Sequence, residues 1–410
     1  MNNNKSNKIF FYITIPSILT SLVPFFLITG SLLTNISVSI CSIIFLINSY
    51  RNKLYKFYQN PFFYFFFIFF IVMLISSIFS LEPFKYLKKS LYYLRFIIFS
   101  LSTWYLIEQN KKLLIQIFSV ILCCYFLLII DGLIQYYTGQ NIFGFNIFSP
   151  NRISSFFGDE LVMGSYLSRL LPILICLYLV FIKNFTFKHS IIFFLLLSFI
   201  GFLIFLSGER TSLFYFIVFL VISILIVKFF FARVSLLATF FIILLIPFFS
   251  ENASKRIFNL TKDQLLNDKT IFFSDHHTEI YLSSYKIFSQ NNIWIGSGPG
   301  SFRDICYKLL IDKNDSLWSC STHPHNTYLQ ALTELGITGF IMISLALLFS
   351  IKILLKKENS SAIRLLSICF IISLFPMIPS ASLFGSWIST IYYYPIGIYL
   401  FLKNNPKMKL

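Results

Sequence analysis

Histidine is the side chain best suited to proton transfer near neutral pH, and His325 stands in a sequence that would position it. The residues Thr327-x-x-Gln330 fit a capping box and predict a helix that begins at this point. His325 would then precede the helix N-terminus, where the helix dipole keeps an imidazole neutral and able to accept a proton. The alternative is a histidine that only hydrogen-bonds its loop. We expect His325 to act without His323, because Pro324 lies between them and keeps the two from facing one hydroxyl.

Arginine is the second residue type whose placement suggests chemistry. A guanidinium group binds phosphate through two hydrogen bonds and keeps its charge. Four arginines, Arg152, Arg169, Arg210 and Arg303, stand in or beside polar segments between apolar runs. Gathered around one apolar cavity, they would suit a lipid-linked pyrophosphate.

Two of these arginines also have structural explanations. Arg210 follows a short polar turn, so it is either a ligand-binding group at the membrane boundary or an interface anchor paired with Glu209. Arg169 lies about eight residues into an apolar run, roughly 12 Å deep by helical rise. That depth is costly without a partner, and Asp159 or Glu160 is the partner that we expect if its role is structural.

Other polar clusters predict no cofactor. His276 and His277 with nearby acidic residues lack an HExxH or CxxC pattern, so we expect a solvated loop and no metal site. The glycines of residues 296–300 lack the Gly-Lys-Ser/Thr ending of a nucleotide loop and predict a tight turn. Cys306 and Cys320 are the one cysteine pair expected in an oxidising compartment, which favours a disulfide between them.

The elements that carry these residues are predicted from composition and hydropathy. Of 410 residues 57% are hydrophobic, 12% are charged and the mean hydropathy is +0.78, so most of the chain must face lipid or other apolar helices. We expect an all-α polytopic membrane protein of about twelve transmembrane helices, with one large polar loop between the ninth and tenth. The predicted spans are residues 9–30, 32–49, 61–81, 91–107, 114–135, 161–182, 189–206, 211–231, 233–250, 336–355, 362–382 and 386–402.

The basic residues orient this arrangement, and their excess over the acidic residues gives the chain a net charge of +17. With both termini in the cytoplasm, 18 of the 33 lysines and arginines are cytoplasmic, as the positive-inside rule requires. An exception is the group Lys85, Lys88 and Lys89 on the outer side. Only three of nine arginines are cytoplasmic, which indicates an anionic group on the outer face. The basic residues form no stripe, so nucleic acid is not an expected partner. Residues 1–250 would form the first nine helices, residues 251–335 the outer loop and residues 336–410 the last three helices.

The order of these parts resembles the bacterial O-antigen ligase and O-antigen polymerase superfamily of membrane glycosyltransferases. Ser207-Gly208-Glu209-Arg210 is similar to the family's serine-arginine turn, with Glu209 in place of the usual serine. Gly296-x-Gly-Pro-Gly-x-Phe302 is similar to its glycine stretch. His325-Asn326-x-Tyr328-Leu329 with Glu334-x-Gly336 resembles its most recognisable motif.

The resemblance implies transfer of a glycan from a polyprenyl-pyrophosphate carrier to a hydroxyl on the periplasmic face of the bacterial inner membrane. The implied mechanism is metal-independent and inverting, with no cofactor. His325 would take the acceptor's proton, Arg210 and Arg152 would stabilise the pyrophosphate, Arg303 or Arg169 would assist, and Glu334 would belong to the glycan site. The partners would be the carrier-linked glycan donor, a lipid A-core or glycan acceptor, and membrane lipids.

Ligase and polymerase share these motifs. The overall resemblance favours a ligase, whose acceptor is a sugar of the lipid A core, over a polymerase that joins carrier-linked repeat units. A transporter or lipid-glycan flippase is a more distant alternative, because it would need cationic residues along a path through the inner half of the membrane.

Overall fold

The computed structural model describes residues 10–148, 152–182, 184–246, 275–311, 320–376 and 378–405. Within these ranges the chain is helical and forms no named strand; an isolated bridge joins Gln140 and Asn146. The predicted all-α class is therefore confirmed. The predicted boundary at residue 250 and the outer arginine Arg256 lie outside the described residues.

The helices, in chain order, are η1 (Phe10–Thr14), α2 (Ile15–Thr29), α3 (Ser31–Asn52), η2 (Tyr55–Phe57), α4 (Pro61–Ile78), α5 (Pro83–Gln109), α6 (Lys112–Thr138), η3 (Ser155–Phe157), α7 (Met163–Phe181), α8 (Phe187–Leu206), α9 (Arg210–Ile226), α10 (Phe230–Leu245), α13 (Asp275–Gln290), α14 (Phe302–Ile311), α15 (Thr327–Leu355), α16 (Ser361–Ser373) and α17 (Ser386–Asn404).

Each of the twelve predicted apolar ranges overlaps a helix, although the range 362–382 continues beyond the end of α16 at Ser373. Eight helices in the described part of the chain are long and apolar enough to cross a membrane, and α9, α10 and α16 are apolar but shorter. The chain is therefore a multi-pass membrane protein, and the total of twelve spans stays a prediction.

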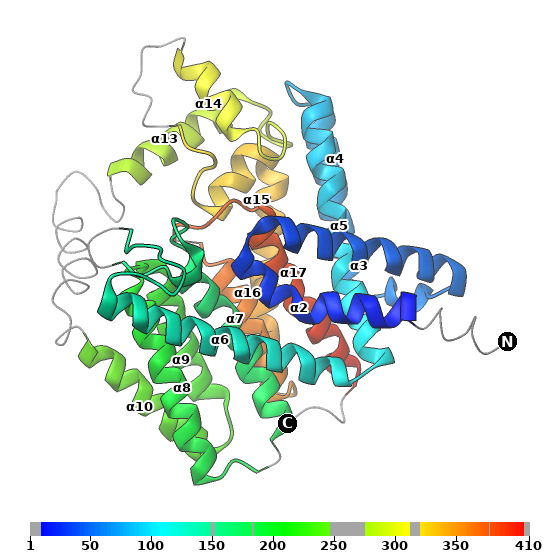
Figure 1. The fold of residues 1–410 in the computed structure, drawn as a ribbon. Helices are drawn as coiled ribbons and strands as arrows, with labels where there is room; N and C mark the ends of the chain where they lie inside the picture. The colour runs from blue at the N-terminus through cyan, green and yellow to red at the C-terminus, as the bar shows by residue number, and fades with distance from the viewer. Residues whose placement is uncertain are drawn as a thin grey trace.

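The centre of the bundle is built around α5 and α7. In each of these two helices 78% of the apolar window is buried, more than in any other candidate span among the described residues. Helix α5 packs against α17 and α4, while α7 packs against α16 and α9. Helices α8, α9 and α10 lie together at one side of the bundle (Figure 1). The N-terminal end of α7 therefore lies at a meeting point of the first and second halves of the chain.

The predicted outer loop is more structured than expected. Helices α13 and α14 lie together at one end of the molecule (Figure 1), and Ile280, Ile287, Phe302 and Ile305 form a small core between them. The expectation of a solvated loop around His277 was wrong, because apolar side chains recur at helical spacing along α13. Helix α15 begins at Thr327, where the sequence predicts a helix start, and it continues through the predicted span at 336–355.

A glycine contact joins this outer segment to α15. Gly336 has φ +67° and kinks α15, which places the kink at the predicted boundary between loop and span. Gly296, at φ +71°, packs so closely that a Cβ there would lie 2.5 Å from the backbone of Glu334. Glycine is required at both positions, and the predicted tight turn over residues 296–300 serves this backbone-to-backbone contact.

The lysines of the predicted outer group hold the same segment. Lys85 of α5 forms an ion pair of 2.7 Å with Asp304 of α14. Lys89 donates to the carbonyl oxygen of Gly300 at 3.1 Å, and the Tyr86 hydroxyl donates to Asp304 at 2.8 Å. These contacts fix α14 to the N-terminal end of α5, which gives the two lysines a structural role.

Candidate functional site

His325 lies at the N-terminal end of α15, as predicted, but the helix is capped differently. The N-cap is Asn326, whose side-chain oxygen accepts from the backbone N–H groups of Tyr328 and Leu329 at 2.9 and 3.1 Å. The predicted capping box that starts at Thr327 was wrong, because Thr327 lies inside the helix and its hydroxyl bonds Ser380 at 2.8 Å. His325 itself adopts φ +52°, an uncommon conformation for a residue other than glycine.

Three imidazole rings gather at this helix end. The ring centroids of His323 and His325 are 4.1 Å apart, and those of His277 and His325 are 5.7 Å apart. Pro324 therefore leaves the two rings in contact, and the expectation that they do not face one hydroxyl stays a prediction. His277 comes from α13, and no local pattern predicts its approach because about fifty residues separate it from His325.

His323 is held as a neutral ring. Its Nε2 lies 3.1 Å from the carbonyl oxygen of Ser380, which can only accept, so this nitrogen carries the proton. Its Nδ1 lies 2.9 Å from the Thr322 hydroxyl. Burial lowers the pKa of His323 below its ordinary value, in spite of the bond to Ser380. His323 therefore supports the loop, and His325 is the better candidate for proton transfer.

The second part of the site is the N-terminus of α7, which Glu209 caps. The Glu209 carboxylate accepts from the backbone N–H groups of Gly164 and Ser165 at 2.6 and 3.0 Å and from the Ser212 hydroxyl at 2.9 Å. Burial raises the pKa of Glu209, while the hydrogen bonds from Ser212 and Gly164 and the charge of Arg152 act in the opposite direction. Glu209 therefore fixes the turn between α8 and α9 on α7.

This turn brings two of the predicted arginines together. Arg210 is the first residue of α9 and is exposed. Arg152 is half-buried, and its Nε donates to the carbonyl oxygen of Ser207 at 3.0 Å. Both arginines thus lie at one polar turn near the end of α7, although 58 residues separate them in the chain.

Arg169 lies deeper and has partners other than the predicted ones. Its guanidinium donates to the hydroxyl oxygens of Ser165, Ser373 and Tyr215 at 3.1, 3.0 and 3.2 Å. It also stacks over the Tyr215 ring at 4.7 Å. The expected pairing with Asp159 or Glu160 was wrong, because both carboxylates are exposed and hydroxyls surround the buried arginine instead.

Arg169 connects the arginines with the histidine end of α15. Its guanidinium lies 6.0 Å from the Tyr392 ring of α17, and the Tyr392 hydroxyl donates to Ser373 at 3.3 Å. Tyr392 also lies within interaction range of the Thr327 side chain in the first turn of α15. Buried residues of α7, α16 and α17 therefore link the two clusters.

A buried polar network that was not predicted from the sequence supports the segment that follows Arg152. The Gln135 side chain of α6 accepts from the backbone N–H groups of Ser154 and Ser155 at 2.9 and 2.7 Å. Asp131, one turn earlier, accepts from the Ser155 hydroxyl and from the backbone of Ile142. The available signal was an acidic residue inside an apolar span, which usually has a specific partner.

The last two predicted site residues lie with the outer segment. Arg303 is exposed on α14, with its guanidinium 5.9 Å from the Tyr307 ring. Glu334 is fully buried, and its carboxylate accepts from the backbone N–H groups of Gly300 and Phe302 at 2.7 and 3.1 Å. This geometry does not support direct contact between Glu334 and a glycan. It favours a role for Glu334 in holding the glycine turn of residues 296–300.

Two further expectations concern cysteine and metal. Cys306 and Cys320 are joined by a disulfide in the structure, across a sequence separation of 14. In the part of the chain that the structure describes, no group of three or more His, Cys, Asp or Glu residues could hold a metal ion.

Comparison with known families matches one segment of the chain. Residues 191–344 match the family model described as O-Antigen ligase, which confirms the predicted resemblance to the ligase and polymerase superfamily. The match includes Arg210, Arg303, His325 and Glu334, whereas Arg152 and Arg169 precede it. No curated protein matches the chain.

Proposed function

We propose that the chain is a glycosyltransferase that uses a polyprenyl-pyrophosphate-linked glycan as donor, because residues 191–344 match the family model described as O-Antigen ligase. The proposed acceptor is a sugar hydroxyl of the lipid A core, on the periplasmic face of the bacterial inner membrane. Both substrates are lipids in this proposal, which agrees with a site at the end of a membrane bundle.

The observation that carries the proposal is the pairing of an arginine cluster with a histidine. Arg152 and Arg210 share the turn at the N-terminus of α7, and Arg169 links that region to the first turn of α15, which follows His325. A pyrophosphate leaving group needs cations that are already in place when its charge develops. A hydroxyl nucleophile needs a base near neutral pH. The site supplies both.

The proposed reaction is a direct displacement at the anomeric carbon of the donor. The acceptor oxygen forms a bond to this carbon while the bond from carbon to the pyrophosphate oxygen breaks. The electron pair of the broken bond leaves with the pyrophosphate, and the hydroxyl proton passes to His325. Attack opposite the leaving group would invert the anomeric configuration, and these steps require no metal.

The exposure of the arginines suggests how they divide this work. Arg210 is exposed and Arg152 is half-buried, so both can reach a phosphate that enters from the membrane surface. Arg169 is 3% exposed and binds three hydroxyls of the protein itself. We therefore assign pyrophosphate contact to Arg210 and Arg152, and we assign Arg169 the role of holding α7, α9 and α16 together beneath them.

Deletion of the gene from its host tests the proposal, with lipopolysaccharide read on a gel. A ligase predicts loss of the whole ladder, with unmodified core remaining. Core carrying a single repeat would instead identify a polymerase, and an unchanged ladder would contradict both assignments. Complementation with wild-type and His325→Ala genes would attribute the phenotype to this chain and to this residue.

A further inference from the structure

The His325 ring has a hydrogen-bonding neighbour that the proposed mechanism does not yet use. The Ser321 hydroxyl lies 2.9 Å from Nε2 of His325. A serine hydroxyl can donate to this nitrogen or accept from it, so the contact couples the orientation of the Ser321 hydroxyl to the tautomer of the ring. Ser321 is therefore placed to orient the ring of the proposed base.

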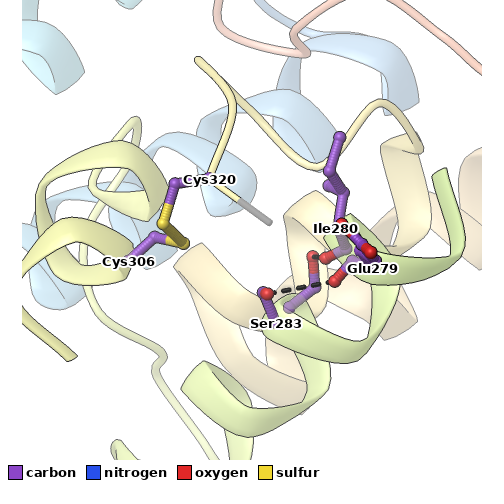
Figure 2. Close-up of a disulfide and its surroundings, with 6 residues drawn as sticks. Glu279, Ile280, Ser283, Cys306 and Cys320 are labelled. Atoms are coloured by element: carbon purple, nitrogen blue, oxygen red, sulfur yellow. Dashed lines mark hydrogen bonds between the residues drawn. A yellow bond between two sulfur atoms is a disulfide. The ribbon is translucent and has the colours of Figure 1, made fainter. Parts of the chain in front are cut away.

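Ser321 is itself held by a covalent link to α14. It directly follows Cys320, whose sulfur is bonded to that of Cys306. Figure 2 shows this disulfide close to α13, near Ile280. Cys306 is 1% exposed and belongs to the small core that Ile280 and Phe302 share. The disulfide thus connects Ser321 to a packed unit.

That unit is anchored to the membrane bundle at two points. Asp304 of α14 binds Lys85 and Tyr86 of α5 at 2.7 and 2.8 Å. The N-terminus of α14 is held by α15, because Phe302 donates its backbone N–H to the buried Glu334 carboxylate at 3.1 Å. Helix α15 begins just after His325, whereas the disulfide ties the residue before Ser321 to α14. Ser321 and His325 are therefore attached to two helices that contact each other.

We propose that Ser321 is a positioning residue for His325 and that the Cys306–Cys320 disulfide keeps it in place. In this arrangement the hydrogen bond between the Ser321 hydroxyl and Nε2 holds the orientation of the His325 ring and favours one of its two neutral tautomers. This inference rests on the proposed role of His325 as base. It adds that the docked outer segment orients that base.

The first test reads the tautomer directly and does not depend on activity. Nitrogen-15 NMR of histidine-labelled protein in nanodiscs distinguishes protonated from unprotonated ring nitrogens, with His325→Gln used to assign the signal. We expect neutral His325 to hold one tautomer in the wild type and to become a mixture of tautomers in Ser321→Ala. A mixture of tautomers in the wild type, or spectra that do not change in Ser321→Ala, would overturn the proposal.

The second test separates positioning from binding by kinetics. With purified polyprenyl-pyrophosphate-linked glycan and lipid A-core in nanodiscs, Ser321→Ala should lower kcat about tenfold and leave KM for both substrates close to wild type. Ser321→Thr keeps the hydroxyl and should recover most of the rate. Ser289→Ala, an exposed serine on α13, serves as the control. Equal rates in Ser321→Ala and wild type would refute the positioning role, whereas a wild-type enzyme without transfer activity would refute only the proposed function.

The third test concerns the disulfide. Mass spectrometry after alkylation without reductant should find Cys306 and Cys320 unlabelled. In a Cys306→Ala/Cys320→Ala background, Ser321→Ala should lower kcat by much less than tenfold, because the disulfide no longer holds Ser321 in place. A full tenfold loss in that background would show that the disulfide does not act through Ser321. If the double variant fails to fold, the NMR comparison in the disulfide-bonded protein still decides the role of Ser321.

Discussion

The Glu209 carboxylate lies 2.6 Å from the backbone nitrogen of Gly164, which joins the turn between α8 and α9 to the first turn of α7. The approach is close, since a Cβ on Gly164 would lie 2.9 Å from the Glu209 carboxylate and 2.6 Å from the Ser207 hydroxyl. A carboxylate is favoured there because it meets the unpaired N–H groups and the positive end of the α7 dipole. Glu209 also stands next to Arg210, so one residue caps a helix and sets the position of a proposed phosphate ligand.

We therefore expect Glu209→Gln to weaken the site without preventing membrane insertion. The amide keeps one acceptor oxygen but loses the charge, and helix caps of this kind contribute about 0.5–2 kcal/mol. The KM for the pyrophosphate donor should rise several-fold, measured by glycan transfer in nanodiscs. Glu160→Gln is the matched control, because that carboxylate lies in the same outer region and is exposed. An equal effect in the control would show that the capping contact does not matter.

Arg210 and Arg169 should respond differently to substitution. Arg210→Lys keeps the charge but loses the two-pronged hydrogen bonding, so turnover should fall substantially while the melting temperature stays near wild type. Arg169→Lys should lower the melting temperature, because an ammonium group cannot serve three hydroxyls and an aromatic face at once. Thermal unfolding and transfer assays on both variants separate the two roles.

The control for these arginines is Arg51→Lys. Arg51 lies at the C-terminal end of α3, outside the proposed site, and donates to the Tyr12 hydroxyl. Full activity in Arg210→Lys would support a simple interface anchor. A melting temperature unchanged in Arg169→Lys would contradict the structural role assigned to its three hydroxyl contacts.

The membrane orientation is the basis of every assignment to an outer face. Alkaline phosphatase fused after residue 290 should be active, and green fluorescent protein fused after residues 358 and 408 should fluoresce, because the first reporter needs the periplasm and the second the cytoplasm. Residue 290 ends α13, which belongs to the unit that brings His277 to His325. A cytoplasmic signal at residue 290 would place the site on the wrong side for the proposed substrates.

The sequence predicted the helices well and the contacts between them poorly, for a physical reason. Hydropathy reports how each segment interacts with lipid, so all twelve apolar ranges overlap helices. It contains no information on which helix faces which, and the partners of Arg169 therefore came from α9 and α16 rather than from the nearest carboxylates. The same limit hid the approach of His277 to His325.

Local sequence signals predicted where the candidate residues lie better than they predicted which residues contact them. The polar turn before Arg210 and the helix after His325 lie where the sequence indicated. The cap moved by one residue, from Thr327 to Asn326, because Thr327 instead bonds Ser380 in the segment between α16 and α17. That bond pairs residues 53 apart, which a pattern confined to a few neighbouring positions cannot anticipate.

The neutral state of His323 predicts a pH dependence at this helix end. Burial lowers the pKa of His323 in the folded protein below the ordinary value of 6.5. Below pH 6.5 the unfolded segment therefore binds a proton more readily than the folded segment does. The stabilisation is present above that pH and is lost as the pH falls through the lowered pKa. Hydrogen exchange of residues 320–328, corrected for the intrinsic rate, should show easier opening at pH 5 than at pH 7. His323→Gln should remove most of this difference; His189→Gln, at the start of α8, should not.

The most direct prediction concerns His325. If it is the base, His325→Ala should reduce turnover by about 10²–10⁴-fold. Binding of the carrier-linked glycan should persist, because Arg152 and Arg210 lie on the turn beside α7 and do not depend on the imidazole. A histidine that only holds the loop would instead damage folding and binding together. Transfer rate, donor affinity and melting temperature, measured on the same protein in nanodiscs, distinguish these two cases.

The choice of control decides how this result is interpreted. His323→Ala is unsuitable as an inert control, since its ring lies 4.1 Å from that of His325 and its Nε2 bonds Ser380, whose own N–H donates to the His325 carbonyl at 2.8 Å. We expect His323→Ala to lose part of the activity together with thermal stability. His189→Gln is the better control, because glutamine also fits the capping position that His189 occupies after Thr186. A His323→Ala protein that is stable but inactive, beside an active His325→Ala protein, would move the base to His323.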